Sequence, residues 1–190
     1  MSGCLLSIAC ALAAPADDSW CVFYDGAFQI EPTGAWTSPL TSSRKTPEGL
    51  RIVDPSTEGG SGRFYHADWQ VDPQAGATVE ARLQVVSCSA PWGVVLLVSD
   101  GLHEEGVTFF PQQVALAMAG ISAPFDTQTA PHTYRVRIEG TDIRVWADDQ
   151  LLLDGRGKFT APALAKRSRV GFGCGSSDAT GEAVWQSVRF

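Results

Sequence analysis

Apolar and polar residues alternate one by one over residues 132–155, which read HTYRVRIEGTDIRVWADDQLLLDG. Tyr134, Val136 and Ile138 occupy every second position, and the same alternation returns at Ile143 after a Glu-Gly-Thr-Asp segment. Successive side chains of a strand point to opposite faces of a sheet, so this pattern is typical of strands with one face in a core. The segment is therefore predicted to form a strand, a turn and a second strand.

The rest of the chain shows short strand-like runs separated by turn residues. Residues 93–101 carry a continuous apolar run, which is typical of a central strand covered on both faces. In residues 63–71 the pattern leaves two orientations open, with either Tyr65 and Trp69 or His66 and Asp68 facing inward. Only residues 161–167 would allow even a short helix. The other predicted strands fall at residues 20–28, 50–54, 78–87, 106–110, 113–120, 168–175 and 183–190.

These runs predict the fold class. The chain contains 19 Gly and 11 Pro, and Asp-Gly pairs supply turns at Asp25, Asp100 and Asp154. The sequence shows no internal repeat and no low-complexity linker that would divide it. We therefore expect an all-β, two-sheet antiparallel β-sandwich, or jelly roll, as a single domain over residues 17–190.

Residues 1–16, MSGCLLSIACALAAPA, differ from the rest of the chain. They carry no charge, and an apolar run from Cys4 to Ala14 is followed by small residues. This composition predicts a secretory leader cleaved near Ala13 or Ala16, although a basic segment before the run is missing. A disordered or partly packed tail is the alternative, and lipidation at Cys4 or Cys10 is a less supported one. The leader predicts a protein that is secreted or lies on the exterior of the cell envelope.

Charge and hydrophobic content exclude some classes of partner and support a packed core. The formal net charge of −7 opposes binding to a phosphate backbone, so nucleic acid is not expected as a partner. The apolar run near the N-terminus is too short to span a bilayer as a helix, so no transmembrane segment is expected. At 44% hydrophobic residues, the chain has enough apolar material for a sizeable core.

Two of the five cysteines fall in the predicted leader, which leaves Cys21, Cys88 and Cys174. An exported protein with three cysteines most simply forms one disulfide and keeps one free thiol. Cys88 and Cys174 both lie at the ends of predicted strands, so we expect a Cys88–Cys174 disulfide. No Cys-x-x-Cys pair and no Cys/His spacing indicates a zinc site.

The alternating segment at 132–155 resembles the strand–turn–strand unit of concanavalin A-like lectin and glucanase domains, which commonly runs Y-x-V-x-I-x-G-x-x-I-x-V-x-x-D-G. Residues 169–190 also resemble the end of that family, with a Gly-rich strand before a last strand that carries an aromatic residue. The likeness covers residues 20–190 as an order of elements. It implies a concanavalin A-like (laminin G-like) jelly roll. It does not imply one function, because this fold hosts lectins, glycosidases, adhesion modules and spacer domains.

Glycosidases of this fold that attack β-glucans carry a motif that resembles E-x-D-x-x-E on one strand. Alternate positions of a strand place two carboxylates on the same face. The sequence lacks this motif. A glycan-active hydrolase would have to use acids that the sequence does not pair, namely Glu80 with Glu104 or Glu105. His103 lies beside Glu104 and Glu105, a combination that suits acid–base or metal chemistry but is more typical of an exposed loop.

Binding is the function that the pattern favours. With the apolar alternates inward, the strands at 78–87 and 132–147 point polar side chains and one tryptophan outward. Aromatic planes stack on sugar rings, while arginine, carboxylate and amide groups bond sugar hydroxyls and carboxylates. The outer face of any antiparallel sandwich is also polar, so the same residues suit ordinary cross-strand pairing. The candidate ligand-binding residues are Glu80, Arg82, Gln84, Arg135, Arg137, Arg144 and Trp146.

We therefore expect a secreted, non-catalytic carbohydrate-binding or adhesion-type module whose partner is a glycan or polysaccharide. A hydrolase with a carboxylate pair is the alternative, and a structural accessory domain is the third hypothesis. No cofactor is expected except a structural calcium ion, which this fold class sometimes binds near the joined termini. Asp25 and Asp178 are the candidate ligands for that ion, fewer than the six or more oxygens that calcium needs.

Overall fold

Two antiparallel β-sheets pack face to face in the computed structural model, which describes residues 20–28, 32, 35–37, 41–58, 62–175 and 178–190. In sheet A the strand order is β13–β12–β11–β6–β15–β4–β3, and β1 pairs with the end of β15. Its strands are β1 (Val22–Asp25), β3 (Ser42–Thr46), β4 (Gly49–Asp54), β6 (Ala77–Cys88), β11 (His132–Glu139), β12 (Asp142–Ala147), β13 (Gln150–Gly155) and β15 (Gly181–Arg189).

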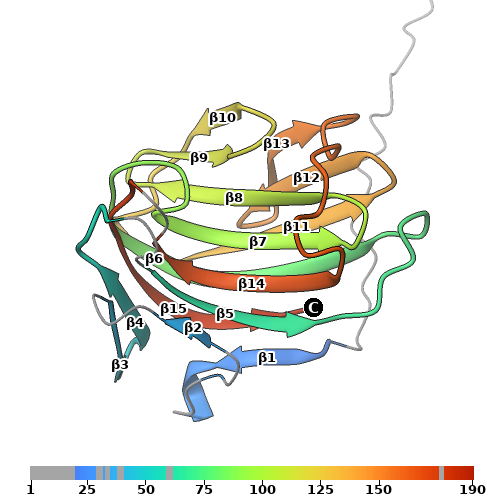
Figure 1. Ribbon diagram of the computed structural model, residues 1–190. Coiled ribbons are helices and arrows are strands. Elements are labelled where there is room, and N and C mark those ends of the chain that lie inside the picture. Colours follow the sequence, from blue (N-terminus) through green and yellow to red (C-terminus); the bar gives the residue numbers. More distant parts are fainter. Residues whose placement is uncertain (1–19, 29–31, 33–34, 38–40, 59–61, 176–177) are drawn as a thin grey trace, which may run out of the picture.

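Sheet B lies in front of sheet A in the view of Figure 1. Its strand order is β10–β9–β8–β7–β14–β5–β2. The strands are β2 (Ala35–Thr37), β5 (Arg63–Asp68), β7 (Val94–Asp100), β8 (Glu104–Phe110), β9 (Gln113–Leu116), β10 (Ile121–Pro124) and β14 (Ser168–Cys174). The fold class is therefore the two-sheet antiparallel sandwich that the sequence predicts.

Helix is nearly absent from the described residues. The 3₁₀ turn η1 (Gly26–Phe28) follows β1, while the segment 161–167 forms turns and bends instead of the short helix considered from the sequence. The described part of the chain contains no helix that is long and apolar enough to cross a membrane. The predicted leader, with Cys4 and Cys10, lies outside the described residues.

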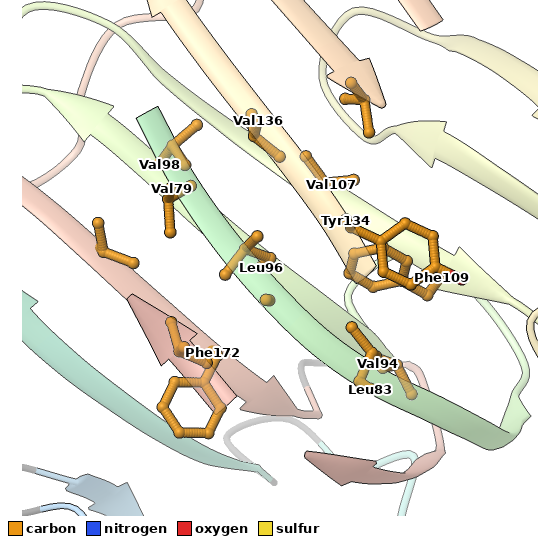
Figure 2. Close-up of a cluster of buried hydrophobic side chains, with 14 of the residues drawn as sticks. Val79, Leu83, Val94, Leu96, Val98, Val107, Phe109, Tyr134, Val136 and Phe172 are labelled. Carbon is orange, nitrogen blue, oxygen red and sulfur yellow. The ribbon is translucent and has the colours of Figure 1, made fainter. Parts of the chain in front are cut away.

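The core lies between the two sheets and follows the predicted alternation. From sheet A, the inward positions of β6 and β11 include Val79, Leu83 and Val136, all fully buried. Leu96 of β7 and Phe109 of β8 face them from sheet B, and Figure 2 shows these side chains meeting between the layers. The burial of these closely packed apolar side chains is the main stabilising contribution to such a sandwich.

Phe172 of β14 is the centre of an aromatic cluster that joins the sheets. Its ring stacks on Tyr65 of the neighbouring strand β5 at a centroid distance of 5.4 Å. It also contacts Trp185 of β15 at 4.9 Å and Phe23 of β1 at 5.3 Å, both in sheet A. The cluster therefore connects the middle of sheet B to the last strand of sheet A and to the N-terminal strand.

The structure shows which face of β5 points inward and how fully β7 is buried. Tyr65 and Trp69 are the inward pair near β5, since they are 1% and 7% exposed, while His66 lies on the outer face. Every residue of β7 is buried, which confirms the prediction of a strand covered on both faces. On its outer face Val95 and Leu97 pack with Phe64, against the partly buried ring of Trp92.

The predicted Cys88–Cys174 disulfide is not formed. Cys21, Cys88 and Cys174 are all free thiols, and the Sγ atoms of Cys88 and Cys174 donate instead to the carbonyl oxygens of Ala90 and Ile52. Cys174 is fully buried, and this burial raises the pKa of its thiol. Position at the end of a strand did not predict pairing, because a disulfide also requires that the two Cβ atoms point at each other.

A β-bulge in β15 decides which of its side chains face outward. Trp185 pairs with Leu83 and Ser187 pairs with Arg82, so Gln186 is an extra residue on this strand. Bulges of this kind bend a strand and redirect a side chain. Here Trp185 and Val188, three positions apart, both point into the core, and the amide of Gln186 lies on the outer face.

Candidate functional site

One cross-strand row of side chains crosses the outer face of sheet A. Trp146 of β12 lies opposite Arg135 of β11, which lies opposite Glu80 of β6. Glu80 in turn lies opposite Arg189 of β15. Neighbouring strands are about 4.8 Å apart, so the row spans roughly 14 Å. Trp20 extends it, because its ring centroid lies 4.6 Å from the guanidinium carbon of Arg189. We call these five residues the charged row.

Glu80 is the electrostatic centre of the charged row. One carboxylate oxygen accepts a hydrogen bond from Arg135 at 3.0 Å, and the other accepts one from Arg189 at 2.9 Å. Glu80 is 7% exposed, so little water competes for these bonds. Arg135 also lies 3.3 Å from the exposed carboxylate of Asp149, while its buried Nε has no partner in the structure. One carboxylate thus fixes two guanidinium groups on the surface of the sheet.

A groove of about 780 Å³ opens beside this row on the outer face of sheet A. Its floor is built from β6, β11 and β15, its first wall from β1 and η1, and its second wall from the turn between β3 and β4. We call it the β15 groove. Its lining residues are Val22, Tyr24, Asp25, Gly26, Ala27, Pro47, Glu48, Gly49, Glu80, Arg82, Thr133, Gln186, Ser187 and Arg189.

Arg82 lies on the floor of the β15 groove in a fixed orientation. Its Nε donates to Gln186 Oε1 at 2.8 Å, and its Nη1 donates to Thr133 Oγ1 at 3.1 Å. The bulge in β15 places the Gln186 amide within reach of this guanidinium. The floor therefore presents arginine, amide and hydroxyl groups that already hold one another in place.

The structure brings some of the predicted ligand-binding residues together and separates others. All of them lie on the outer face of sheet A, and Glu80 and Arg82 line the groove. Arg137 and Arg144 stand opposite each other but bond to nearby acids on their own strands, Glu139 and Asp142. Gln84 donates to the carbonyl oxygen of Gln128, away from the groove. The predicted group therefore divides into a site around Glu80 and Arg82 and a set of ordinary surface pairs.

Several groove residues were not among the sequence candidates. Arg189, Gln186 and Ser187 come from the last strand, and Thr133 comes from the start of β11. The outward position of Thr133 follows from the alternation in 132–155, so that residue could have been identified. The positions in β15 could not, because the bulge at Gln186 reverses the alternation partway along the strand.

The carboxylate pairs considered for a hydrolase do not exist in this fold. Glu80 lies on the outer face of sheet A, whereas Glu104 lies on the outer face of sheet B, beside Arg169 at 2.9 Å. Glu105 points inward and accepts backbone hydrogen bonds from Met118 at 2.7 Å and Ala119 at 2.9 Å. The thickness of the sandwich separates Glu80 from the other two acids, so they cannot flank one glycosidic bond.

The side-chain contacts of His103 are with Asp100 and Phe159, not with Glu104 or Glu105. Its Nδ1 lies 3.3 Å from a carboxylate oxygen of Asp100, and its ring packs edge-on against Phe159. Because Glu104 and Glu105 point to opposite sides of β8, the three side chains do not converge on one point. Among the residues that the structure describes, no group of three or more His, Cys, Asp or Glu side chains is arranged to hold a metal ion.

The proposed calcium pair is also separated. Asp25 pairs with Ser187 near the end of β15, whereas Asp178 precedes the start of that strand at Gly181. Six residues of strand between these points correspond to roughly 20 Å. Asp25 instead accepts a hydrogen bond from the backbone N–H of Ala27 in η1. The two carboxylates therefore cannot share one ion.

The outer face of sheet B is largely covered by the protein's own side chains. A Cβ at Gly106 would lie 2.7 Å from the ring of Trp92, so the indole rests directly on β8. Trp92 has a φ angle of 76°, which is strained for a bulky residue and follows Pro91 in the turn that leads into β7. Beneath this ring Val95 and Leu97 are almost inaccessible. This face is therefore more enclosed than the β15 groove.

His66 lies beside this enclosed surface and should make stability depend on pH. Burial, followed by the charges of Arg169 and Arg167, lowers the pKa of His66 to about 4, although Asp68 opposes the shift. The stability linked to the neutral ring is complete above pH 6.5 and is lost as the pH falls toward 4, because only the unfolded chain binds the proton in this range. We expect His66→Phe, which keeps the ring contact with Phe64, to weaken this loss.

The measurement is the midpoint of thermal unfolding at several pH values between 7 and 4. His66→Gln, which removes the ring, serves as a second variant that cannot titrate. Both variants should lose less stability than the original protein on acidification. An identical slope in all three proteins would contradict a buried, neutral His66.

Comparisons with known proteins agree at the level of the fold. No family model and no curated protein matches the chain. A carbohydrate esterase of the Shiga toxin-encoding bacteriophage phi24B is similar in structure, with a TM-score of 0.55 and 14% identity over 82% of this chain and 88% of that one. Alginate lyase A1-II′ of polysaccharide lyase family 7 has a TM-score of 0.50 and 13% identity, covering 80% and 83% of the two chains. These likenesses are consistent with a concanavalin A-like sandwich.

Proposed function

We propose that this protein is a non-catalytic carbohydrate-binding protein whose ligand lies on the outer face of sheet A. The observation that carries the proposal is the charged row, in which Trp146 and Trp20 flank three charged residues along the edge of the β15 groove. The ligand would extend from the groove along the row to Trp146.

The chemistry of the row suits a sugar. The exposed side of an indole ring offers an apolar plane for the carbon-bound hydrogens of a pyranose. Guanidinium groups, a carboxylate and an amide together donate and accept hydrogen bonds from vicinal hydroxyls. Because Glu80 already holds Arg135 and Arg189, these groups lose little conformational freedom when a ligand binds.

Three further points support this proposal. Proteins named as a carbohydrate esterase and an alginate lyase share the fold, so the architecture is compatible with a carbohydrate ligand. Glu80 is held by Arg135 and Arg189 and lies on the opposite face of the sandwich from Glu104, which favours a binding role for Glu80 over that carboxylate pair. A glycan ligand also agrees with the export that the N-terminal residues predict, since polysaccharides are common outside cells.

Binding to a glycan array, followed by titration calorimetry with the best oligosaccharide, tests this function. We expect Trp146→Ala to weaken binding by about tenfold through the loss of ring stacking. Trp92→Ala, which removes a tryptophan from the opposite face, is the matched control and should keep the affinity. Loss of binding in the control alone would place the ligand on sheet B. No binding to any glycan would contradict the proposed function.

A second measurement separates binding from hydrolysis. We expect no release of reducing sugar from a panel of polysaccharides. Release that Glu80→Gln abolishes, with Glu104→Gln as the comparison, would instead show catalysis at the β15 groove.

A further inference from the structure

Arg82 differs from the other arginines on the outer face of sheet A. Arg135 and Arg189 bond to Glu80, and Arg137 and Arg144 bond to acids on their own strands. Among the described residues, no carboxylate lies within ion-pair distance of Arg82, whose two bonding partners are the neutral side chains of Gln186 and Thr133. Its positive charge is therefore not neutralised by a direct partner.

The Arg82 guanidinium is held in a fixed orientation on the floor of the β15 groove. The bonds to Gln186 and Thr133 occupy Nε and Nη1, so the plane of the guanidinium is fixed, while Nη2 has no hydrogen-bond partner within the described part of the chain. Arg82 lines the groove floor next to Ser187, whose hydroxyl adds a further donor. An arginine fixed in this way suits a carboxylate, which pairs with a guanidinium through charge-assisted hydrogen bonds.

The charges around Arg82 restrict which anionic ligands can approach it. On the floor of the groove Arg82 and Arg189 are positive and Glu80 is negative, so the floor carries one net positive charge, while Arg135 outside the groove is also paired with Asp149. Asp25 and Glu48 line the walls and are negative. A ligand with one carboxylate per sugar can reach the floor, whereas the walls would repel a densely sulfated chain.

We infer that the β15 groove selects acidic glycans and binds the carboxylate of a uronic acid residue through Arg82. This inference rests on the proposed function and specifies its ligand class. The carboxylate pairs with Nη2 of Arg82, and the remaining hydroxyls of the sugar bond to Ser187 and Gln186. The part of the chain that extends along the charged row supplies the stacking contact with Trp146.

The test compares uronate oligosaccharides with their carboxyl-reduced counterparts, which have the same linkages but no charge. Oligogalacturonate, oligoglucuronate and oligomannuronate are titrated in both forms by calorimetry. We expect one of the acidic forms to bind at least about tenfold more tightly than its reduced form. Arg82→Met should remove this preference. Arg144→Met, which removes a paired arginine outside the groove, should keep it.

The possible outcomes distinguish this inference from the function on which it rests. Equal binding of the acidic and reduced forms overturns the selection of acidic sugars and leaves carbohydrate binding intact. A preference for the acid that survives in Arg82→Met overturns the role of Arg82. Absence of binding to every oligosaccharide in both forms, and to the glycan array, overturns the proposed function itself. Unchanged thermal unfolding of Arg82→Met shows that the variant is folded in each case.

Discussion

Replacing Phe172 by alanine is expected to lower the free energy of unfolding by about 3–5 kcal/mol, the range for removing a fully buried aromatic ring. Phe172 is inaccessible to solvent and contacts rings from β5, β15 and β1. Its removal therefore leaves a cavity where the two sheets meet. The loss is large relative to the total stability of an ordinary domain, so we expect part of the variant to be unfolded at ambient temperature. Urea unfolding followed by tryptophan fluorescence measures the change.

Phe110→Ala is the control for this prediction. Phe110 is only partly buried at the end of β8, and its removal should cost about 1 kcal/mol or less. A change below 1 kcal/mol for Phe172→Ala would mean that the sheets do not pack through this cluster.

Glu105→Ala is expected to destabilise the protein by about 2–4 kcal/mol, because three buried or partly buried N–H groups lose their acceptor. The carboxylate of Glu105 accepts hydrogen bonds from the backbone of Gly106, Met118 and Ala119 and so holds the turn after β9 against β8. Faster amide exchange at Met118 and Ala119 should accompany the loss. Chemical unfolding and hydrogen exchange followed by NMR measure the two effects.

Glu139→Gln, at an exposed acid that pairs with Arg137, is the matched control and should change stability by less than about 0.5 kcal/mol.

The stability contributed by Glu105 should also depend on pH. Burial raises the pKa of Glu105, although its backbone hydrogen bonds oppose the shift. The folded state therefore keeps a proton that the unfolded chain releases, and stability should fall as the pH rises from 4.5 through the raised pKa. Glu105→Gln should lack this fall, and an unchanged fall would assign it to another group.

The fold was predictable because burial on one side of a sheet repeats every second residue. The alternation at Tyr134, Val136 and Ile138 reappears as buried positions of β11, and the continuous apolar run became the fully covered strand β7. The orientation of β5 was not predictable, since Tyr65 and His66 begin equally coherent faces. Packing against Phe172 from the neighbouring strand selects Tyr65, and that contact joins residues more than one hundred positions apart.

The site was only partly predictable, for a related reason. Alternation correctly placed Glu80, Arg82 and Arg135 on one face, and the order of strands brought them together. It did not show that Arg137 and Arg144 would bond to neighbouring acids, because short-range pairing depends on side-chain conformations. It also did not show that Glu80 and Glu104 would lie on opposite faces, which depends on the sheet that each strand joins.

The bulge at Gln186 separates the packing of the last strand from the chemistry of the groove. If Gln186 were deleted, Ser187 would follow Trp185 directly, and regular alternation would keep Val188 in the core and Arg189 opposite Glu80. Only the amide that holds Arg82 would be lost. The extra residue therefore adds a polar group to the outer face without changing which side chains pack inside. In variant libraries of this protein, loss of Gln186 should destabilise the fold less than loss of Trp185 or Val188, whose side chains are buried in the core.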